Sequence, residues 1–161
     1  MIRIRRIKEA DIPRLGKLYV QIYKKHNVGE AWTVPAAQRM LRWYLKIAQD
    51  MAYLAEDDGQ IIGAFLVGVK PWWDGNHLLE GEIFVHHDYQ RSGIGSALMK
   101  KILEHGVKKY RAVIWEPFAY EWDYPFKWYK SLGFKKVKGN GLTIISAKPK
   151  DVLNKLKRRE I

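Results

Sequence analysis

The segment at residues 82–95 constrains the fold most, and it reads E-I-F-V-H-H-D-Y-Q-R-S-G-I-G. An apolar strand runs into a polar turn, and a pair of glycines then opens a helix whose apolar residues recur at helical spacing. Gly93 and Gly95 carry no Cβ, so the backbone can approach a ligand closely. Because the first amides of a helix lack intrahelical partners and lie at its positive end, this turn is suited to bind a phosphate group.

The strand before this turn, at residues 78–85, alternates in sequence. Alternation places Leu78, Glu80, Glu82 and Phe84 on one face and the intervening residues on the other. The two glutamates are unusual on an apolar strand, because carboxylates are rarely buried without a reason. The pattern therefore indicates two candidate functional carboxylates, unless this face meets solvent or pairs with arginine.

Two common nucleotide-binding motifs do not fit the turn. A Walker loop requires Lys and then Ser or Thr after its last glycine, whereas Ser96 and Ala97 follow Gly95. The dinucleotide fingerprint requires a third glycine and an acidic residue about 20 positions further on. The turn does contain Gln90-x-x-Gly93-x-Gly95, which resembles the Q/R-x-x-G-x-G/A signature of the GNAT superfamily of acetyl-CoA-dependent N-acetyltransferases. The alternative is an ordinary strand-turn-helix whose glycines serve packing.

A second motif strengthens the resemblance. Residues 129–134 read Y-K-S-L-G-F, which is similar to the Y-x-x-x-G-F that ends a late helix in this family. The resemblance covers residues 2–148 and implies an α/β (α+β) GNAT fold, with a mixed central sheet of about six to seven strands flanked by about four helices. We expect one GNAT domain at residues 1–148 and a short basic helical tail at residues 149–161.

The chain order agrees with this expectation. Asp58-Gly59 is a strong hairpin signal, Asp11 is a candidate N-cap for the first helix, and residues 71–76 are expected to form a loop. The expected strands are 2–5, 51–56, 60–70, 78–85, 111–115, 134–137 and 142–147. The expected helices are 11–26, 33–48, 94–107 and 126–132.

Composition restricts the class of protein. A chain of 161 residues with 47% hydrophobic residues suits one globular domain. The absence of cysteine excludes disulfides, thiolate zinc sites and a covalent cysteine nucleophile, and no metal centre is expected. No run of 18 apolar residues and no signal-peptide core is present, so we expect a cytoplasmic protein without membrane partners.

The net charge of +12 allows three interpretations. The basic residues could bind nucleic acid, attract the phosphates of CoA, or simply form a solvated surface. The basic residues are scattered and no nucleic-acid-binding motif accompanies them, which favours the solvated surface and argues against a nucleic-acid partner.

The resemblance implies acetyl-CoA as cofactor, CoA as product, and direct transfer to a primary amine without a covalent enzyme intermediate. In this family the signature strand supplies a backbone donor for the oxyanion, at a bulge where it parts from its neighbour. That position maps to residues 84–86, and the turn that follows would hold the pyrophosphate. The implied cofactor-binding residues are Phe84, Val85, His86, Gln90, Arg91, Ser92, Gly93, Ile94, Gly95 and Ser96.

The resemblance also implies catalytic roles. Tyr129 of the second motif would protonate the leaving sulfur, since a phenol remains protonated at neutral pH; the alternative is a packed aromatic. The base could be Glu82 or Glu80, because relatives often carry a glutamate on this strand, or ordered water alone. His86 and His87 are further candidates, although His87 occupies a position where the family commonly has proline and suits a turn.

The stretch before Tyr129 departs from the family pattern. Relatives often read N-x-x-A-x-x-[FY]-Y, whereas residues 122–129 read W-D-Y-P-F-K-W-Y, which puts a contact to the pantetheine arm in doubt. The aromatic and acidic residues at 115–129 could hold a cationic amine by cation–π and charge contacts, or could form a small core that anchors a loop. The candidate acceptor-binding residues are Trp32, Trp72, Trp73, Glu121, Trp122 and Asp123.

The expected acceptor is therefore a small-molecule amine or a peptide, and cationic acceptors should outperform acidic ones. One alternative is a protein Nα- or Lys-acetyltransferase. Another is a non-catalytic acyl-CoA-binding module with a basic surface for a partner. The oligomeric state is open, with a homodimer among the alternatives.

Overall fold

A computed structural model describes residues 1–26, 29–122 and 124–137. The chain divides into two compact units, Met1–Phe118 and Ala119–Ile161, and each is described by itself. The first contains all five strands and three of the four α-helices of the described residues, and the second contains the last helix. No helix in the described part of the chain is both long enough and apolar enough to cross a membrane.

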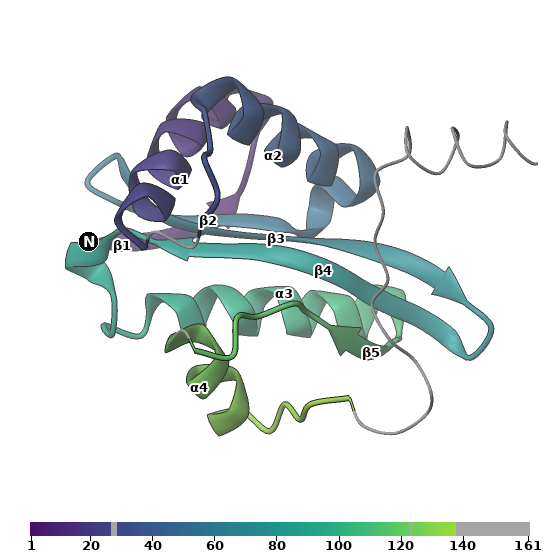
Figure 1. The fold of residues 1–161 in the computed structure, drawn as a ribbon. Helices are drawn as coiled ribbons and strands as arrows, with labels where there is room; N and C mark the ends of the chain where they lie inside the picture. Colours follow the sequence, from purple (N-terminus) through teal and green to yellow (C-terminus); the bar gives the residue numbers. More distant parts are fainter. Residues whose placement is uncertain (27–28, 123, 138–161) are drawn as a thin grey trace, which may run out of the picture. The chain divides into compact units, whose positions relative to one another are not determined.

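The first unit is built on a mixed five-stranded sheet with the order β1-β2-β3-β4-β5 (Figure 1). The first four strands are antiparallel, and β5 runs parallel to β4. The strands are β1 (Ile2–Arg6), β2 (Ala52–Asp57), β3 (Gln60–Trp72), β4 (Gly75–Val85) and β5 (Ala112–Glu116). This confirms the expected fold class.

The strand count lies slightly below the expected six to seven. Residues 134–137, expected to be a strand, have no regular secondary structure. The strand expected at residues 142–147 and the tail at 149–161 lie outside the described residues.

Helices cover both faces of this sheet. Figure 1 shows α1 (Ile12–His26) and α2 (Val34–Ala48) on one face and α3 (Ile94–Tyr110) on the other. The helices form here because each has an apolar stripe at helical spacing, and on α1 this stripe is fully buried at Leu15 and Tyr19. The expected start of the second helix near residue 33 agrees with α2, where Thr33 is the N-cap and its hydroxyl accepts a hydrogen bond from the Ala36 amide at 3.3 Å.

Asp11 does not cap α1 as expected. It ends a short 3₁₀ turn, η1 (Glu9–Asp11), and its carboxylate accepts a hydrogen bond from the Lys8 amide at 2.8 Å. Arg5 of β1 donates to both carboxylate oxygens, at 2.7 and 2.9 Å. The hydrogen bonds from Arg5 are the main reason why the pKa of this buried carboxyl is lowered to about 2. Asp11 therefore ties the first strand to the start of α1.

The loop expected at residues 71–76 is instead part of a long hairpin. β3 continues to Trp72 and pairs with Gly75 at the start of β4, which leaves only Trp73 and Asp74 as the turn. Pro71 suggested a break, but β2 pairs with β3 only as far as Leu66. Because β3 is a sheet edge on that side near its end, a proline can be accommodated there.

A β-bulge in β4 changes the predicted faces of the signature strand. Glu82 lies opposite Leu66 of β3, whereas Leu79 lies opposite Gly68, so Glu80 and Gly81 share a single opposing residue. Their φ angles are +46° and +121°. The extra residue reverses the alternation of side chains across the strand.

The reversal separates residues that the sequence placed on one face. A Cβ added to Gly106 of α3 would lie 3.3 Å from Leu78 Cδ2, so Leu78 packs toward α3. Glu82 instead accepts hydrogen bonds from Tyr19 and Tyr23 of α1, on the opposite side of the sheet. The prediction of one face shared by Leu78 and Glu82 is therefore wrong, because alternation assumes an unbroken ladder.

We expect Gly81→Ala to lower the free energy of unfolding by roughly 1–3 kcal/mol, through backbone strain and crowding. At Gly81, φ is +121°, and an added Cβ would lie 3.1 Å from the Phe65 ring and 3.2 Å from the Leu66 carbonyl oxygen. Gly59→Ala is the matched control, because Gly59 also has positive φ (+83°) but nothing within 4 Å of its Cβ position. Denaturant unfolding should show the larger loss for Gly81→Ala; equal losses would mean that the bulge tolerates a side chain.

Candidate active site

β5 pairs with only the first half of β4. Their parallel ladder ends at the pair Leu79 and Glu116, and within the described residues β4 continues to Val85 without a strand on that side. The Trp115 indole N–H donates to the Glu80 carbonyl at 2.6 Å, at the point of divergence. The parting of the two strands leaves an open backbone edge along the second half of β4.

The hydrogen-bond pattern shows which amides face that edge. The His86 amide donates to the Ile62 carbonyl of β3 at 2.7 Å. Since antiparallel hydrogen-bonded pairs alternate along a strand, the Phe84 amide also faces β3 and the Val85 amide faces the open edge. Of the three backbone positions at which sequence analysis expected an oxyanion donor, Val85 has the suitable orientation, and the bulge lies further back at Glu80–Gly81.

The turn after β4 is arranged as its glycines suggest. The Gln90 side-chain amide donates to the Val85 carbonyl at 3.0 Å, which ties the turn to the strand end. Gly93 is the N-cap residue of α3, with φ of +89° and nothing within 4 Å of its Cβ position. It is therefore needed for backbone conformation, which argues against a packing role at this position. Arg91, also left-handed with φ of +61°, is exposed in the same turn.

The N-terminus of α3 presents free amides. The first helical hydrogen bond runs from the Ala97 amide to the Gly93 carbonyl at 2.9 Å, and no side chain in the described residues caps the helix. The amides of the three preceding residues, Ile94, Gly95 and Ser96, are thus available to an anion at the positive end of the helix. Ser92 is held beside them by a hydrogen bond from its hydroxyl to the Tyr89 carbonyl.

Glu82 lies among aromatic side chains on the α1 side of the sheet. Its Oε2 accepts hydrogen bonds from the hydroxyl groups of Tyr19 at 3.0 Å and Tyr23 at 3.2 Å. The two tyrosine rings stack at 4.3 Å, and Tyr19 makes edge contacts at 5.1 Å with both Phe84 and Trp32. Glu82 as a residue is partly buried, and burial of its carboxyl group dominates the electrostatics of the cluster.

This environment adjusts the acidity of the cluster. Burial raises the pKa of Glu82 to about 7, although the hydrogen bonds from both tyrosines act in the opposite direction. Burial also raises the pKa of the Tyr19 and Tyr23 hydroxyl groups well above the ordinary value, so both remain donors. A carboxyl group that titrates near neutrality can accept a proton from a substrate and release it again.

The other candidate base, Glu80, has a different environment. Its residue is exposed, and its backbone is in a left-handed conformation in the bulge. Its carbonyl, rather than its carboxylate, makes the contact with Trp115. Of the two strand carboxylates, only Glu82 lies in the aromatic cluster.

The structure separates the candidate acceptor residues of the first unit. Trp32 lies in the Glu82 cluster, 5.1 Å from the Tyr19 ring. Trp72 and Trp73 are exposed at the tip of the β3–β4 hairpin. At about 3.3 Å per strand residue, the tip lies roughly 20 Å from Glu82, too far to contact the same small acceptor.

The second unit holds the remaining candidates. Tyr129 is buried in α4 (Tyr124–Ser131), and its ring lies 5.3 Å from the rings of Trp128 and Phe134. Glu121 forms an ion pair with Lys136. Trp122 is two-thirds exposed (66%) and lies 5.3 Å from the Tyr120 ring, while Asp123 is outside the described residues.

Sequence reasoning missed the two tyrosines that hold Glu82. Tyr19 and Tyr23 are four residues apart, so they lie on one side of α1, and that spacing was a readable signal. Their pairing with a strand residue more than 50 positions away was not readable, because the bulge in β4 decides which helix Glu82 faces.

Comparisons with known proteins agree on one family. The model of the acetyltransferase (GNAT) domain matches residues 48–136. An uncharacterized N-acetyltransferase of Methanocaldococcus jannaschii is 27% identical over 137 residues, which cover 83% of this chain and 60% of that protein. This chain therefore spans less than two thirds of the length of that relative.

Solved structures have the same fold. A possible acetyltransferase from Clostridium difficile has a TM-score of 0.72 at 16% identity, with 92% of this chain and 99% of that chain covered. A Pyrococcus horikoshii protein has a TM-score of 0.69 at 25% identity, with 88% and 93% covered. The chain belongs to the GNAT acetyltransferase family.

Proposed function

We propose that this protein transfers an acetyl group from acetyl-CoA directly to a primary amine and releases CoA. The observation that carries the proposal is Glu82, a carboxyl group with a pKa near 7 on the strand whose end presents a free backbone amide. A general base is most useful when its pKa lies close to the working pH. Family membership makes acetyl-CoA the expected donor.

The turn and helix after β4 would hold the donor. The amides of Ile94, Gly95 and Ser96 suit the pyrophosphate of CoA, because they are uncapped and lie at the positive end of α3. Arg91 adds a positive charge beside them. The Val85 amide would donate to the thioester carbonyl, where negative charge develops during attack.

The remaining side chains complete the chemistry. Glu82 would take a proton from the ammonium form of the acceptor, which frees the amine lone pair for attack on the carbonyl carbon. As the tetrahedral intermediate collapses, the C–S bond breaks, and Tyr129 would give its proton to the sulfur of CoA. The absence of cysteine supports direct transfer rather than a cysteine-linked acetyl intermediate.

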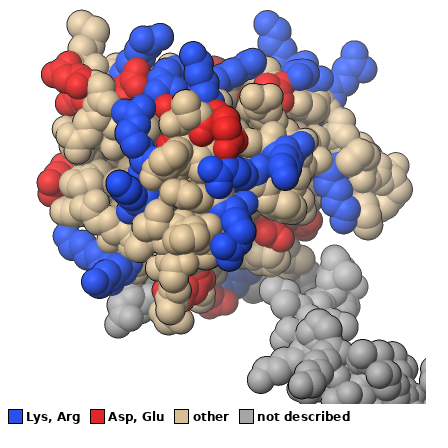
Figure 2. Space-filling model, turned by 90° about the horizontal axis from the view of Figure 1, so that it is seen from above, with Lys and Arg blue, Asp and Glu red and all other residues tan. Residues whose placement is uncertain are grey.

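The acceptor is proposed to be cationic. Trp32 and Tyr23 present aromatic rings close to the Glu82 carboxyl group, an arrangement that attracts an ammonium by cation–π and charge contacts. Figure 2 shows basic and acidic side chains intermixed on the face seen from above, without one large basic patch on that face. This distribution supports a small amine or peptide rather than nucleic acid as acceptor.

Release of CoA thiol tests the proposed activity. Spermidine and a Lys-rich peptide should give higher kcat/KM than glutamate at fixed ionic strength. A preference for glutamate would contradict a cationic acceptor but not acetyl transfer. Binding of acetyl-CoA without CoA release for any amine would favour the alternative of a non-catalytic acyl-CoA-binding module.

We expect Gly95→Val to weaken acetyl-CoA binding by roughly tenfold or more, since each tenfold loss requires only 1.4 kcal/mol. A branched side chain in the first turn of α3 would occupy the space where the phosphate approaches the amides. Ala97→Val is the matched control: Ala97 is exposed in the same turn, but its amide is already bonded to Gly93. Calorimetry should show a loss for Gly95→Val alone. Unchanged affinity in a folded Gly95→Val protein would contradict the assignment.

A further inference from the structure

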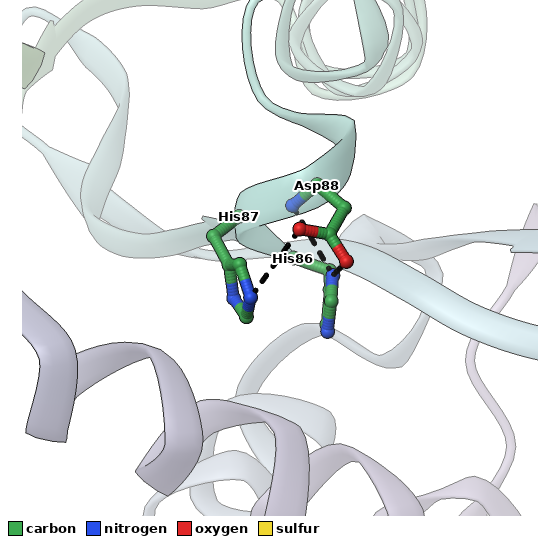
Figure 3. Close-up of side chains that lie close together, drawn as sticks. All are labelled: His86, His87 and Asp88. Atoms are coloured by element: carbon green, nitrogen blue, oxygen red, sulfur yellow. Dashed lines mark hydrogen bonds and ion pairs between the residues drawn. The ribbon is translucent and has the colours of Figure 1, made fainter.

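Three adjacent residues bring their side chains together at the end of β4. His86 follows the strand, and His87 and Asp88 begin the 3₁₀ turn η3 (His87–Tyr89). Figure 3 shows the Asp88 carboxylate at one edge of the two imidazole rings, with a contact to each ring. One nitrogen from each ring and one carboxylate oxygen all lie within 4.8 Å of one another.

The spacing is close to that of a metal site. His86 Nδ1 lies 3.8 Å from Asp88 Oδ2, and His87 Nε2 lies 3.4 Å from Asp88 Oδ1. Four ligands in a tetrahedron around Zn²⁺, each at about 2.0–2.1 Å, are roughly 3.3–3.4 Å apart. To bind one ion, the ligand atoms, which now lie up to 4.8 Å apart, would have to approach one another through rotation of the side chains.

Both histidines can supply a lone pair. The Asp88 amide donates a long hydrogen bond to His86 Nδ1 at 3.3 Å, and the Gln21 side-chain amide lies 3.4 Å from His86 Nε2. An ion bound at Nδ1 would take over the lone pair that the Asp88 amide now contacts. His87 Nδ1 is buried and has no hydrogen-bond partner among the described residues. No bond at Nδ1 therefore resists rotation of the His87 ring toward an ion.

The surroundings suit a cation. Asp88 is exposed, with 71% of its side chain accessible, so an ion and its water ligands can reach the carboxylate. The neighbouring Tyr89 hydroxyl donates to the Asp57 carboxylate at 3.3 Å, and the charge of Asp57 is paired with the N-terminal ammonium group at 3.0 Å.

We propose that His86, His87 and Asp88 bind a divalent transition-metal ion of the Zn²⁺ type, with water completing the coordination. Two imidazoles and one carboxylate form a ligand set that suits Zn²⁺ and similar ions, whereas Mg²⁺ and Ca²⁺ favour ligand sets made of oxygen atoms alone. Sequence analysis expected no metal and took His87 for a turn residue. The bound ion would cross-link the turn that leads into the Gln90–Gly95 signature segment.

The contrasting explanation is a turn held only by ring stacking and by hydrogen bonds to Asp88. The rings of His86 and His87 stack at 4.2 Å with an interplanar angle of 24°. The chain contains a natural control for a histidine–aspartate pair without a second imidazole. His77 Nε2 lies 2.7 Å from Asp74 Oδ1 in the β3–β4 hairpin.

Calorimetric titration of the untagged, chelator-treated chain with Zn²⁺ tests the site, with Mg²⁺ as the comparison ion. We expect one Zn²⁺ per chain at micromolar affinity and no binding of Mg²⁺. His87→Ala and Asp88→Asn should each weaken Zn²⁺ binding at least about tenfold. A loss of about that size occurs even when only a residue that hydrogen-bonds to a metal ligand is removed, so loss of a ligand itself should cost no less. His77→Ala should leave it unchanged.

The outcomes separate the two explanations. No stoichiometric Zn²⁺ binding by the wild-type chain overturns the site, as does a loss in His77→Ala equal to that in His87→Ala. Asp88→Asn retains the size of the side chain, so it reports on ligation even if His87→Ala disturbs the turn. Because no acetyl-CoA is present in the titration, its result does not depend on the proposed acetyl transfer.

Discussion

Glu82→Gln is expected to lower kcat by roughly 10²–10⁴-fold, the usual contribution of general acid–base catalysis. Glutamine retains an oxygen that can accept the hydrogen bonds from Tyr19 and Tyr23, so the fold and the donor site should be preserved. It cannot accept a proton from the ammonium group. Stopped reactions that measure CoA thiol, under conditions where chemistry limits the rate, provide the measurement.

The pH dependence gives the same experiment a second readout. Because burial raises the pKa of Glu82 to about 7, wild-type kcat/KM should rise with pH through that value as the carboxyl group loses its proton. Glu82→Gln should lose this inflection. An unchanged inflection in the variant would assign the titration to another group.

Stability should respond to pH in the opposite direction. The folded-state pKa of Glu82 lies above the ordinary value of 4.5, so between 4.5 and about 7 the folded state holds a proton that the unfolded state has released. The contribution of Glu82 to the free energy of unfolding is therefore complete below pH 4.5 and is lost as the pH rises through about 7. Denaturant unfolding of Glu82→Gln should lack this decline.

Glu80→Gln separates the two candidate carboxylates. Glu80 is exposed in the bulge and lies outside the aromatic cluster, so its replacement should cost far less activity than that of Glu82. Equal losses would mean that the strand carboxylates act together or that neither is the base. A loss in Glu80→Gln alone would reverse the assignment.

The sequence predicted the parts of this fold that depend on local pattern. The helical stripe of α1, the start of α2 near Thr33 and the Asp58-Gly59 hairpin are each encoded within a few residues, and the structure has them all. The glycine turn was also readable, because positive φ at Gly93 requires glycine or a strained residue. These features needed no information about distant partners.

The sequence predictions were wrong where contacts with residues far away in the chain determine the local structure. Strict alternation placed Leu78 and Glu82 on one face, but the bulge at Glu80–Gly81 turns them toward different helices. Asp11 looked like a helix cap, but the Arg5 guanidinium from β1 holds it in the preceding turn. A two-residue period cannot reveal an extra residue, because that residue is defined only by the strand opposite.

In the candidate site, too, local features could be predicted from the sequence and features that depend on distant contacts could not. The Gly93–Gly95 turn and the Glu82 carboxylate were identified from motif and polarity, but the raised pKa depends on the aromatic side chains that α1 packs over the strand. Trp72 and Trp73 were grouped with Trp32 by residue type alone. Their separation follows from the length of the β3–β4 hairpin, which the sequence suggested was a loop.

Tyr129→Phe is expected to lower kcat by roughly 10²–10⁴-fold while leaving acetyl-CoA affinity unchanged, if the phenol donates the proton that the leaving sulfur requires. The substitution removes only the hydroxyl group. The ring contacts with Trp128 and Phe134 remain, so α4 should stay folded. Calorimetry for acetyl-CoA and steady-state CoA release together separate loss of chemistry from loss of binding.

Tyr110→Phe is the matched control for the loss of one phenol. Tyr110 donates to Asp50 at 2.6 Å at the end of α3 and has no part in the proposed chemistry, so its replacement should leave kcat unchanged. A loss below about threefold, with chemistry shown to limit the rate, would fall short of what a general acid contributes and would leave Tyr129 as a packing residue of α4.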